Sequence, residues 1–237
     1  MKQASRMFPF ITHPPYNPVG GECPYHCVYC WVKELLSRFP RLKDKYSGEP
    51  RLFPTELVKK FPAGAYIFAC DMLDLLAMPR EIVYTVANVM AGNPQCKFLV
   101  ETKNPKALLD MGIDWSSNIT LGVTIESNRN YPELSNAPRQ TERLYWITHV
   151  AKARQGKNSL FVSIEPVLDF DLEDFALQLY WIKPWGVAVG YDNYSHNLEV
   201  EPFLAKTMQL IRELEKFTTV YRKTLRPAWN EKERDLK

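Results

Sequence analysis

Three of the five cysteines in this 237-residue chain lie within one stretch of eight residues. Cys23, Cys27 and Cys30 have the spacing Cys-x3-Cys-x2-Cys, which begins two residues after a Gly-Gly pair. Three thiolates on one short loop can bind three corners of an iron–sulfur cubane, whereas a closed structural zinc site needs four ligands. The spacing therefore predicts a [4Fe-4S] cluster whose fourth iron has no protein ligand and can bind a small molecule.

Two other interpretations of the cysteine loop stay open. His26 lies inside the loop and would complete a Cys3His set for zinc, or the loop binds no metal. With zinc, the chain would be a metal-stabilised binding module without catalytic turnover. An odd number of cysteines, in a chain too large to need disulfides, favours a metal or cluster site in a reducing compartment. We therefore expect a cytoplasmic protein.

The cysteine loop resembles that of the radical S-adenosylmethionine (radical SAM) enzymes, in which an aromatic residue such as Tyr29 precedes the third cysteine and packs near the adenine of the cofactor. The chain also resembles a small radical SAM family found in phages, bacteria and archaea, and it is distantly similar to spore photoproduct lyase. The segments that carry this resemblance are Asn17 to Cys23, Phe98 to Pro105, Leu121 to Glu126 and Phe161 to Val167.

The resemblance implies two cofactors, a [4Fe-4S] cluster on the three loop cysteines and S-adenosylmethionine at the open iron. A flavodoxin- or ferredoxin-like partner would supply one electron, and cleavage of the cofactor would give a 5′-deoxyadenosyl radical that abstracts a substrate hydrogen. We expect a nucleoside or nucleic-acid base as substrate, with a peptide or a small metabolite as the alternative. The net charge of +3 permits nucleic-acid binding without indicating it.

The elements that must position this site follow from residue 65 onward, where short apolar strands alternate with helical patterns about six times. This rhythm requires parallel strands with crossover helices, and the almost continuous apolar strands indicate a sheet covered on both faces. We expect an α/β fold, a partial (β/α)6 TIM-like barrel of the radical SAM type. An open doubly wound sheet is the alternative, although no Gly-x-Gly-x-x-Gly follows any strand. The expected strands are 66–69, 97–100, 119–125, 160–164, 186–189 and 218–221, and the expected helices are 31–39, 79–91, 105–111, 139–153, 171–182 and 202–216.

Polar residues stand where these strands end, which is where parallel α/β folds carry their active sites. We expect Lys103 to meet the carboxylate of S-adenosylmethionine and Asp71 to meet its amine. Thr124 and Glu126 follow the next strand and are placed to bind the ribose hydroxyls. The alternatives are structural: an exposed loop lysine, a core hydroxyl, or a carboxylate with a structural partner.

Two further strand-end residues are candidates for the substrate side of the site. Glu165 should emerge at the mouth of the barrel, where it orients substrate or shapes the cofactor pocket, unless it pairs with a neighbouring base. Cys70, by similarity to spore photoproduct lyase, is the expected catalytic hydrogen-atom donor, and its alternative is a small buried apolar residue. The segment after the strand at 186–189 is either a polar loop or a substrate contact. Its polar residues are Asp192, Asn193, Tyr194 and His196.

Length and composition indicate one folded domain over 1–237, since 46% of the residues are apolar and 24% are charged. The longest apolar runs fall far short of the ~20 residues that cross a bilayer, so no membrane partner is expected. Trp181 and Trp185 either stack on a base or plug one end of the barrel. Within the domain we expect an extended N-terminal arm (1–16), the cluster loop (17–30), a surface insertion (40–62) and a frayed tail (231–237).

Overall fold

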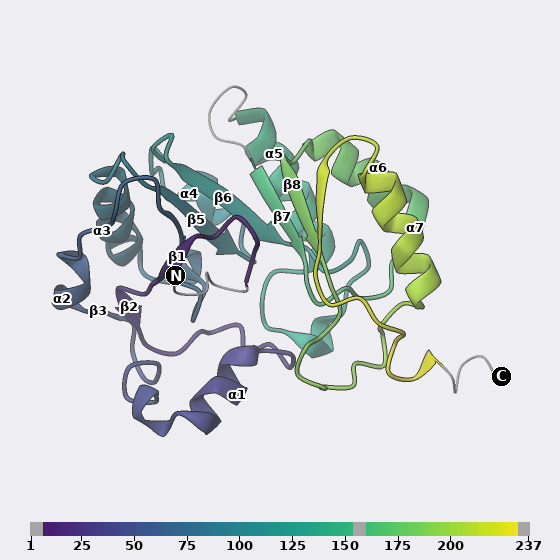
Figure 1. The fold of residues 1–237 in the computed structure, drawn as a ribbon, viewed down its shortest axis with the longest axis horizontal. Coiled ribbons are helices and arrows are strands. Elements are labelled where there is room, and N and C mark those ends of the chain that lie inside the picture. The colour runs from purple at the N-terminus through teal and green to yellow at the C-terminus, as the bar shows by residue number, and fades with distance from the viewer. Residues whose placement is uncertain (1–6, 154–159, 232–237) are drawn as a thin grey trace.

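The computed structural model of the protein describes residues 7–153 and 160–231. The first six residues of the expected arm, and the expected frayed tail beyond Glu231, lie outside the described residues. Seven parallel strands form one curled sheet, a half-barrel (Figure 1). Their order across the sheet is β1 (His13–Tyr16), β4 (Tyr66–Ala69), β5 (Lys97–Thr102), β6 (Ile119–Thr124), β7 (Leu160–Ile164), β8 (Gly186–Val189) and β9 (Thr219–Arg222).

The six strands expected from the sequence are confirmed, and the N-terminal arm adds a seventh. His13 of β1 pairs with Ile67 of β4, so the arm is an edge strand of the sheet. Pro14 and Pro15 lie inside β1 and donate no backbone hydrogen bonds, which confines such a strand to an edge. The sequence predicted the extended conformation of the arm but not this pairing.

The longer helices that follow the strands cover the outer, convex face of the sheet, whereas the helix after the cysteine loop lies below the sheet (Figure 1). Residues alternate along each strand, so on β5 Phe98 and Val100 face the helices while Leu99 faces inward. No helix in the described part of the chain is both long and apolar enough to cross a membrane. The helices are α1 (Trp31–Arg38), α2 (Pro54–Leu57), α3 (Arg80–Ala91), α4 (Ala107–Asp110), α5 (Gln140–Ala153), α6 (Leu172–Ile182) and α7 (Leu204–Leu214), with 3-10 turns η1 (Pro40–Leu42), η2 (Leu75–Ala77) and η3 (Pro132–Leu134).

An aromatic cluster fills one end of the concave face of the sheet. Phe8 and Phe10 of the N-terminal segment stack with ring centroids 5.5 Å apart and contact Phe161 at 5.0 and 5.2 Å. Trp185 packs against Phe10 at 5.1 Å, so it plugs the barrel. Trp181 lies on α6 and is 64% exposed. The aromatic cluster closes one end of the half-barrel and leaves its other end open.

A small two-stranded sheet leads the chain into the cysteine loop. β2 (Val19–Gly20) pairs antiparallel with β3 (Arg51–Leu52), which lies in the 40–62 segment. Gly21 then turns with φ of 107°, and a Cβ at this position would lie 2.7 Å from the Cα of Pro50. Glycine is therefore required both for the left-handed turn and for the close approach. The 40–62 segment is mostly exposed, although its Tyr46 and Phe61 are buried.

Candidate functional site

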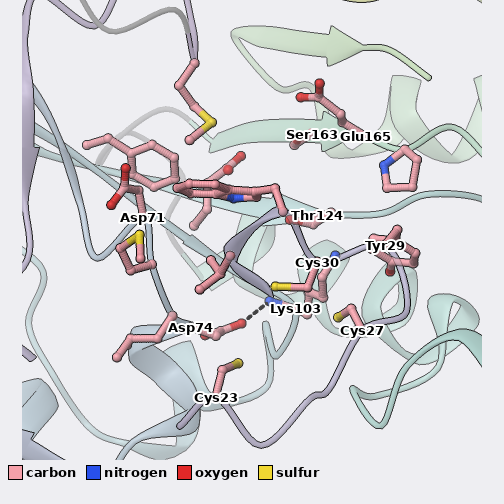
Figure 2. Close-up of a pocket in the computed structure, with 18 of the residues that line it drawn as sticks. Cys23, Cys27, Tyr29, Cys30, Asp71, Asp74, Lys103, Thr124, Ser163 and Glu165 are labelled. Atoms are coloured by element: carbon pink, nitrogen blue, oxygen red, sulfur yellow. Dashed lines mark hydrogen bonds between the residues drawn. The ribbon is translucent and has the colours of Figure 1, made fainter. Parts of the chain in front are cut away.

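A cavity of about 700 Å³ opens among the carboxyl ends of the strands (Figure 2). Its volume lies within the range of small-molecule sites. All three loop cysteines line it, so the fold brings residues 23–30 against strand ends that are 40 to 200 residues away in sequence. Of the other site residues expected from the sequence, the cavity is lined by Tyr29, Cys70, Asp71, Lys103, Thr124 and Glu165.

The cysteine loop is fixed by the segment around η3, which follows β6. The amide of Val28 donates to the carbonyl of Leu134 at 2.8 Å, and the carbonyl of Tyr25 accepts from the amide of Asn136 at 2.8 Å. The thiol of Cys27 lies 3.1 Å from the hydroxyl of Ser135. These contacts position the loop over the mouth of the half-barrel.

Three thiols on one loop are a donor set that an iron–sulfur cluster can use. Within residues 7–153 and 160–231, no three His, Cys, Asp or Glu side chains converge on one point that could hold a metal ion. A cubane needs no such convergence, because each cysteine binds a different iron. His26 is half-exposed and its Nδ1 lies 3.5 Å from Glu22, which gives it another partner than the thiols. Burial raises the pKa of Cys23 to about 11, and a metal centre beside it would favour the thiolate.

Glu126 is completely buried behind the cavity wall, and both of its carboxylate oxygens are occupied. Tyr29 Oη donates to Oε1 at 2.6 Å, Lys103 Nζ donates to the same oxygen, and Arg143 Nη1 donates to Oε2 at 2.7 Å. Burial opposes ionisation of Glu126, but the charges of Arg143 and Lys103 and these hydrogen bonds outweigh it and lower its pKa to about 2. Glu126 therefore holds Tyr29 and Lys103 in place and does not itself line the cavity.

Arg143 is a residue that the sequence analysis missed. It lies on α5 with its side chain 1% exposed, and it also donates to the carbonyls of Pro138 at 2.6 Å and Thr124 at 3.1 Å. An arginine on a helix surface is ordinary in a sequence, so only the packing of α5 against β6 distinguishes it.

Asp74 was also missed, although it lines the cavity. Its carboxylate accepts from the amide of Leu76 at 3.0 Å, from the hydroxyl of Thr102 at 2.8 Å and from the amide of Lys103 at 2.6 Å. Asp74 thereby ties the end of β5 to the segment after β4, as Figure 2 shows for its contact with Lys103. An aspartate directly before η2 is a helix-capping signal that could have identified it.

Cys70 and Asp71 leave β4 in an unusual conformation. Cys70 has φ of 60°, a region that residues other than glycine rarely adopt, and its amide donates to the carbonyl of Tyr16 at 2.8 Å. Burial raises the pKa of the Cys70 thiol well above its ordinary value, so it keeps its hydrogen. Asp71 accepts from Asn17 Nδ2 at 2.7 Å, and burial raises the pKa of its carboxyl group.

The opposite wall of the cavity contains Glu165 at the end of β7. Lys223, just after β9, lies 3.3 Å from its Oε2, so Glu165 has the basic partner that the structural interpretation expected while it also lines the cavity. Burial raises the pKa of Glu165, and Lys223 opposes this effect. Of the polar loop after β8, Asp192, Asn193 and Tyr194 line the cavity, while His196 bonds to Asp192 at 2.7 Å.

Solved structures of two other proteins have a similar fold. Spore photoproduct lyase complexed with dinucleoside spore photoproduct matches with a TM-score of 0.64 and 12% identity over 93% of this chain and 79% of that chain. Streptococcus suis SuiB bound to S-adenosylmethionine matches with a TM-score of 0.51 and 11% identity over 88% of this chain and 50% of that chain. SuiB bound to precursor peptide SuiA matches with a TM-score of 0.51 and 12% identity over 90% of this chain and 50% of that chain.

Both neighbours are radical SAM enzymes, and the likeness is one of fold at low sequence identity. It confirms the expected partial barrel of the radical SAM type. This chain spans half the length of SuiB. No family model and no curated protein sequence matches the chain.

Proposed function

We propose that this protein is a radical SAM enzyme that binds a [4Fe-4S] cluster and S-adenosylmethionine in the cavity at the mouth of the half-barrel. One observation carries the proposal: the three thiols of the Cys-x3-Cys-x2-Cys loop line a cavity at the strand ends of a sheet with the radical SAM fold. When bound, the reduced cluster supplies the electron that cleaves S-adenosylmethionine into methionine and the 5′-deoxyadenosyl radical that abstracts a substrate hydrogen. The chain's own residues bind and orient the reactants.

The residues around the cluster loop divide the binding of the cofactors. Cys23, Cys27 and Cys30 hold the cluster. Lys103, steadied by Glu126, has two further N–H groups with which to bind the carboxylate of S-adenosylmethionine. The ring of Tyr29 lies 5.2 Å from Lys103 Nζ and offers an apolar surface to the adenine.

The other cofactor contacts come from the next strand ends. We assign the ribose hydroxyls to Thr124 alone, because Thr124 lines the cavity whereas Glu126 is fully buried and does not. Asp71 accepts one hydrogen bond from Asn17 and retains acceptor capacity for the methionine amine.

Cys70 is the proposed catalytic hydrogen-atom donor. It is buried, lines the same cavity and has a raised pKa that keeps the S–H bond intact, which is what a donor of a hydrogen atom requires. It would return a hydrogen atom to a substrate radical after the first abstraction.

For the substrate we propose a nucleoside or nucleic-acid base, processed with an electron from a flavodoxin- or ferredoxin-like donor. The nucleoside choice is supported by the fuller match to a structure that holds a dinucleoside, which covers 79% of that chain. The peptide alternative has the support of SuiB, at 50% coverage of that chain.

The test is anaerobic iron and sulfide analysis, with electron paramagnetic resonance of the reduced protein before and after addition of S-adenosylmethionine. We expect about four irons per chain and a cluster signal that changes when the cofactor is added. Zinc without iron after anaerobic reconstitution would refute the proposal and leave a zinc-stabilised α/β binding module.

A further inference from the structure

Glu101 lies on the inner face of the half-barrel, next to a glycine that makes room for it. It is paired in register with Gly122 of the neighbouring strand β6. A Cβ on Gly122 would lie 2.6 Å from Cγ and 3.3 Å from Oε1 of Glu101. A glycine inside a strand is typical of such a close approach. Because Gly122 has no side chain, the Glu101 side chain can lie against the sheet, where it forms part of the cavity wall.

One oxygen of the Glu101 carboxyl group lacks a hydrogen-bond partner among the described residues. Its Oε1 is buried and accepts no hydrogen bond from any residue that the structure describes. A buried polar atom in this state is rare in folded proteins and indicates a missing ligand or water. Since Glu101 lines the cavity, a ligand in the cavity can reach its carboxyl group.

The charges around Glu101 decide its protonation state. Burial is the largest cause that raises the pKa of Glu101, to about 8, and the negative charges of Glu165 and Asp74 act in the same direction. The positive charges of Lys103 and Lys223 oppose this increase. The folded protein therefore holds Glu101 as a neutral acid at pH 7. A neutral carboxyl group presents one O–H donor and one C=O acceptor side by side.

The side chains next to Glu101 on the inner face of the sheet are apolar. Leu99, two residues earlier on β5, packs in one buried cluster with Phe68 and Phe161 on the inner face. The register pairs Gly122 with Phe161, so this aromatic surface begins beside Glu101. Phe8 and Phe68 of this cluster line the cavity, so a planar ring could lie against them while its polar edge meets the carboxyl group.

We propose that Glu101 is a substrate-binding residue that recognises a heterocyclic ring through an edge carrying an adjacent hydrogen-bond acceptor and donor, as nucleobases do. Such an edge is the complement of a neutral carboxyl group, with one hydrogen bond in each direction. A trans peptide group places its C=O and N–H on opposite sides, so a peptide backbone cannot satisfy both bonds at once. The inference rests on the proposed function, and it narrows the substrate of that site to a ring.

The test measures binding instead of turnover, by anaerobic calorimetry on the cluster-reconstituted chain. The ligands are uridine, 3-methyluridine, in which a methyl group replaces the N–H donor, and N-acetylasparagine amide, an open-chain carboxamide. The variants are Glu101→Gln, which keeps one donor and one acceptor, Glu101→Met, which removes both, and Glu173→Met, an exposed control on α6. The melting temperature of each variant reports whether it folds.

We expect uridine to bind about tenfold or more tightly than 3-methyluridine and the carboxamide, and Glu101→Met to lose about the same factor. Glu101→Gln should bind uridine within about threefold of the parent chain. Parent binding should fall above pH 8, where Glu101 loses its proton, while the glutamine variant should lack this step. Glu101→Met should melt no lower than Glu173→Met, because it removes an unsatisfied buried oxygen.

Several results would overturn the inference: no binding of uridine, equal binding of 3-methyluridine or of the carboxamide, or full binding by Glu101→Met. Each of them leaves the proposed function intact if the cluster signal still responds to S-adenosylmethionine. Conversely, a chain without iron refutes the radical SAM assignment, whatever its affinity for uridine.

Discussion

Replacement of Arg143 by Met should destabilise the protein far more than replacement of an exposed helical arginine would. The side chain of Arg143 is 1% exposed and pairs with Glu126, which is 0% exposed. Met has a similar length and keeps the apolar packing, so the change removes mainly the charge and the hydrogen bonds. The variant leaves the Glu126 carboxylate buried with Lys103 and Tyr29 as its remaining partners.

The magnitude follows from the pKa of Glu126. The folded protein lowers this pKa from 4.5 to about 2, which corresponds to about 3 kcal/mol of stabilisation of the charged form. Removal of one partner of a buried ion pair generally costs about 3–5 kcal/mol. For a domain of this size, such a loss should lower the melting temperature by roughly 10 °C.

The assay is equilibrium urea unfolding together with thermal melting, with Arg129→Met as the matched control. Arg129 pairs with Asp169 and Asp171, but its side chain is 40% exposed. Solvent screens these pairs, so the control should lose about 1 kcal/mol or less. Both variants remove an arginine with carboxylate partners, and they differ mainly in burial.

The reasoning would be refuted by equal losses in Arg143→Met and Arg129→Met. A second variant, Arg143→Met combined with Glu126→Gln, separates the buried charge from the lost packing. Because the glutamine carries no charge, the double variant should be more stable than Arg143→Met alone. If it is less stable, the uncompensated charge is not the cause of the loss.

Three further predictions concern acid stability, the cysteines and the paired strands. Because folding lowers the pKa of Glu126, its ionised carboxylate contributes fully to the free energy of unfolding above pH 4.5, and this contribution should disappear as pH falls toward 2. Glu126→Gln should flatten this part of the curve of stability against pH. An unchanged curve would contradict the stabilising role of the Glu126 carboxylate. Serine at any one of the three loop cysteines should lower the iron content well below four per chain, whereas Cys96→Ser should keep the iron content of the parent chain. Cys70→Ala should change the product or the rate at which it forms. An unchanged product and rate would refute the role of Cys70 as hydrogen-atom donor. Gly122→Ala should lower the free energy of unfolding, measured in urea, by about 1–3 kcal/mol because the new Cβ meets the Glu101 side chain. Glu101→Ala in the same chain should restore part of this free energy. If it restores none, the contact with Glu101 is not the cause of the loss.

Much of the fold followed from local pattern. The six strands from 66–69 to 218–221 were predicted within a few residues, because each is a short apolar run between helical patterns. Strands that alternate with helices in this way form parallel sheets with crossover helices. The candidate cluster ligands were equally visible, since all three cysteines lie within one loop and their spacing is itself the signal. Strand-end positions such as Lys103 and Thr124 were predicted at the cavity because parallel strands end at one edge of a sheet.

The tertiary structure decided what those residues contact. Glu126 was predicted to face the ribose, yet Tyr29 and Arg143, which lie 97 and 17 residues away, take up its oxygens. Glu101 carried no signal as one acidic residue just after an expected strand, and its side chain has room only because Gly122 lies beside it in the neighbouring strand. Composition and periodicity fix which residues form strands and helices, because those preferences act over a few residues. Register and crossover packing fix which side chains meet, and they depend on contacts between residues far apart in the chain.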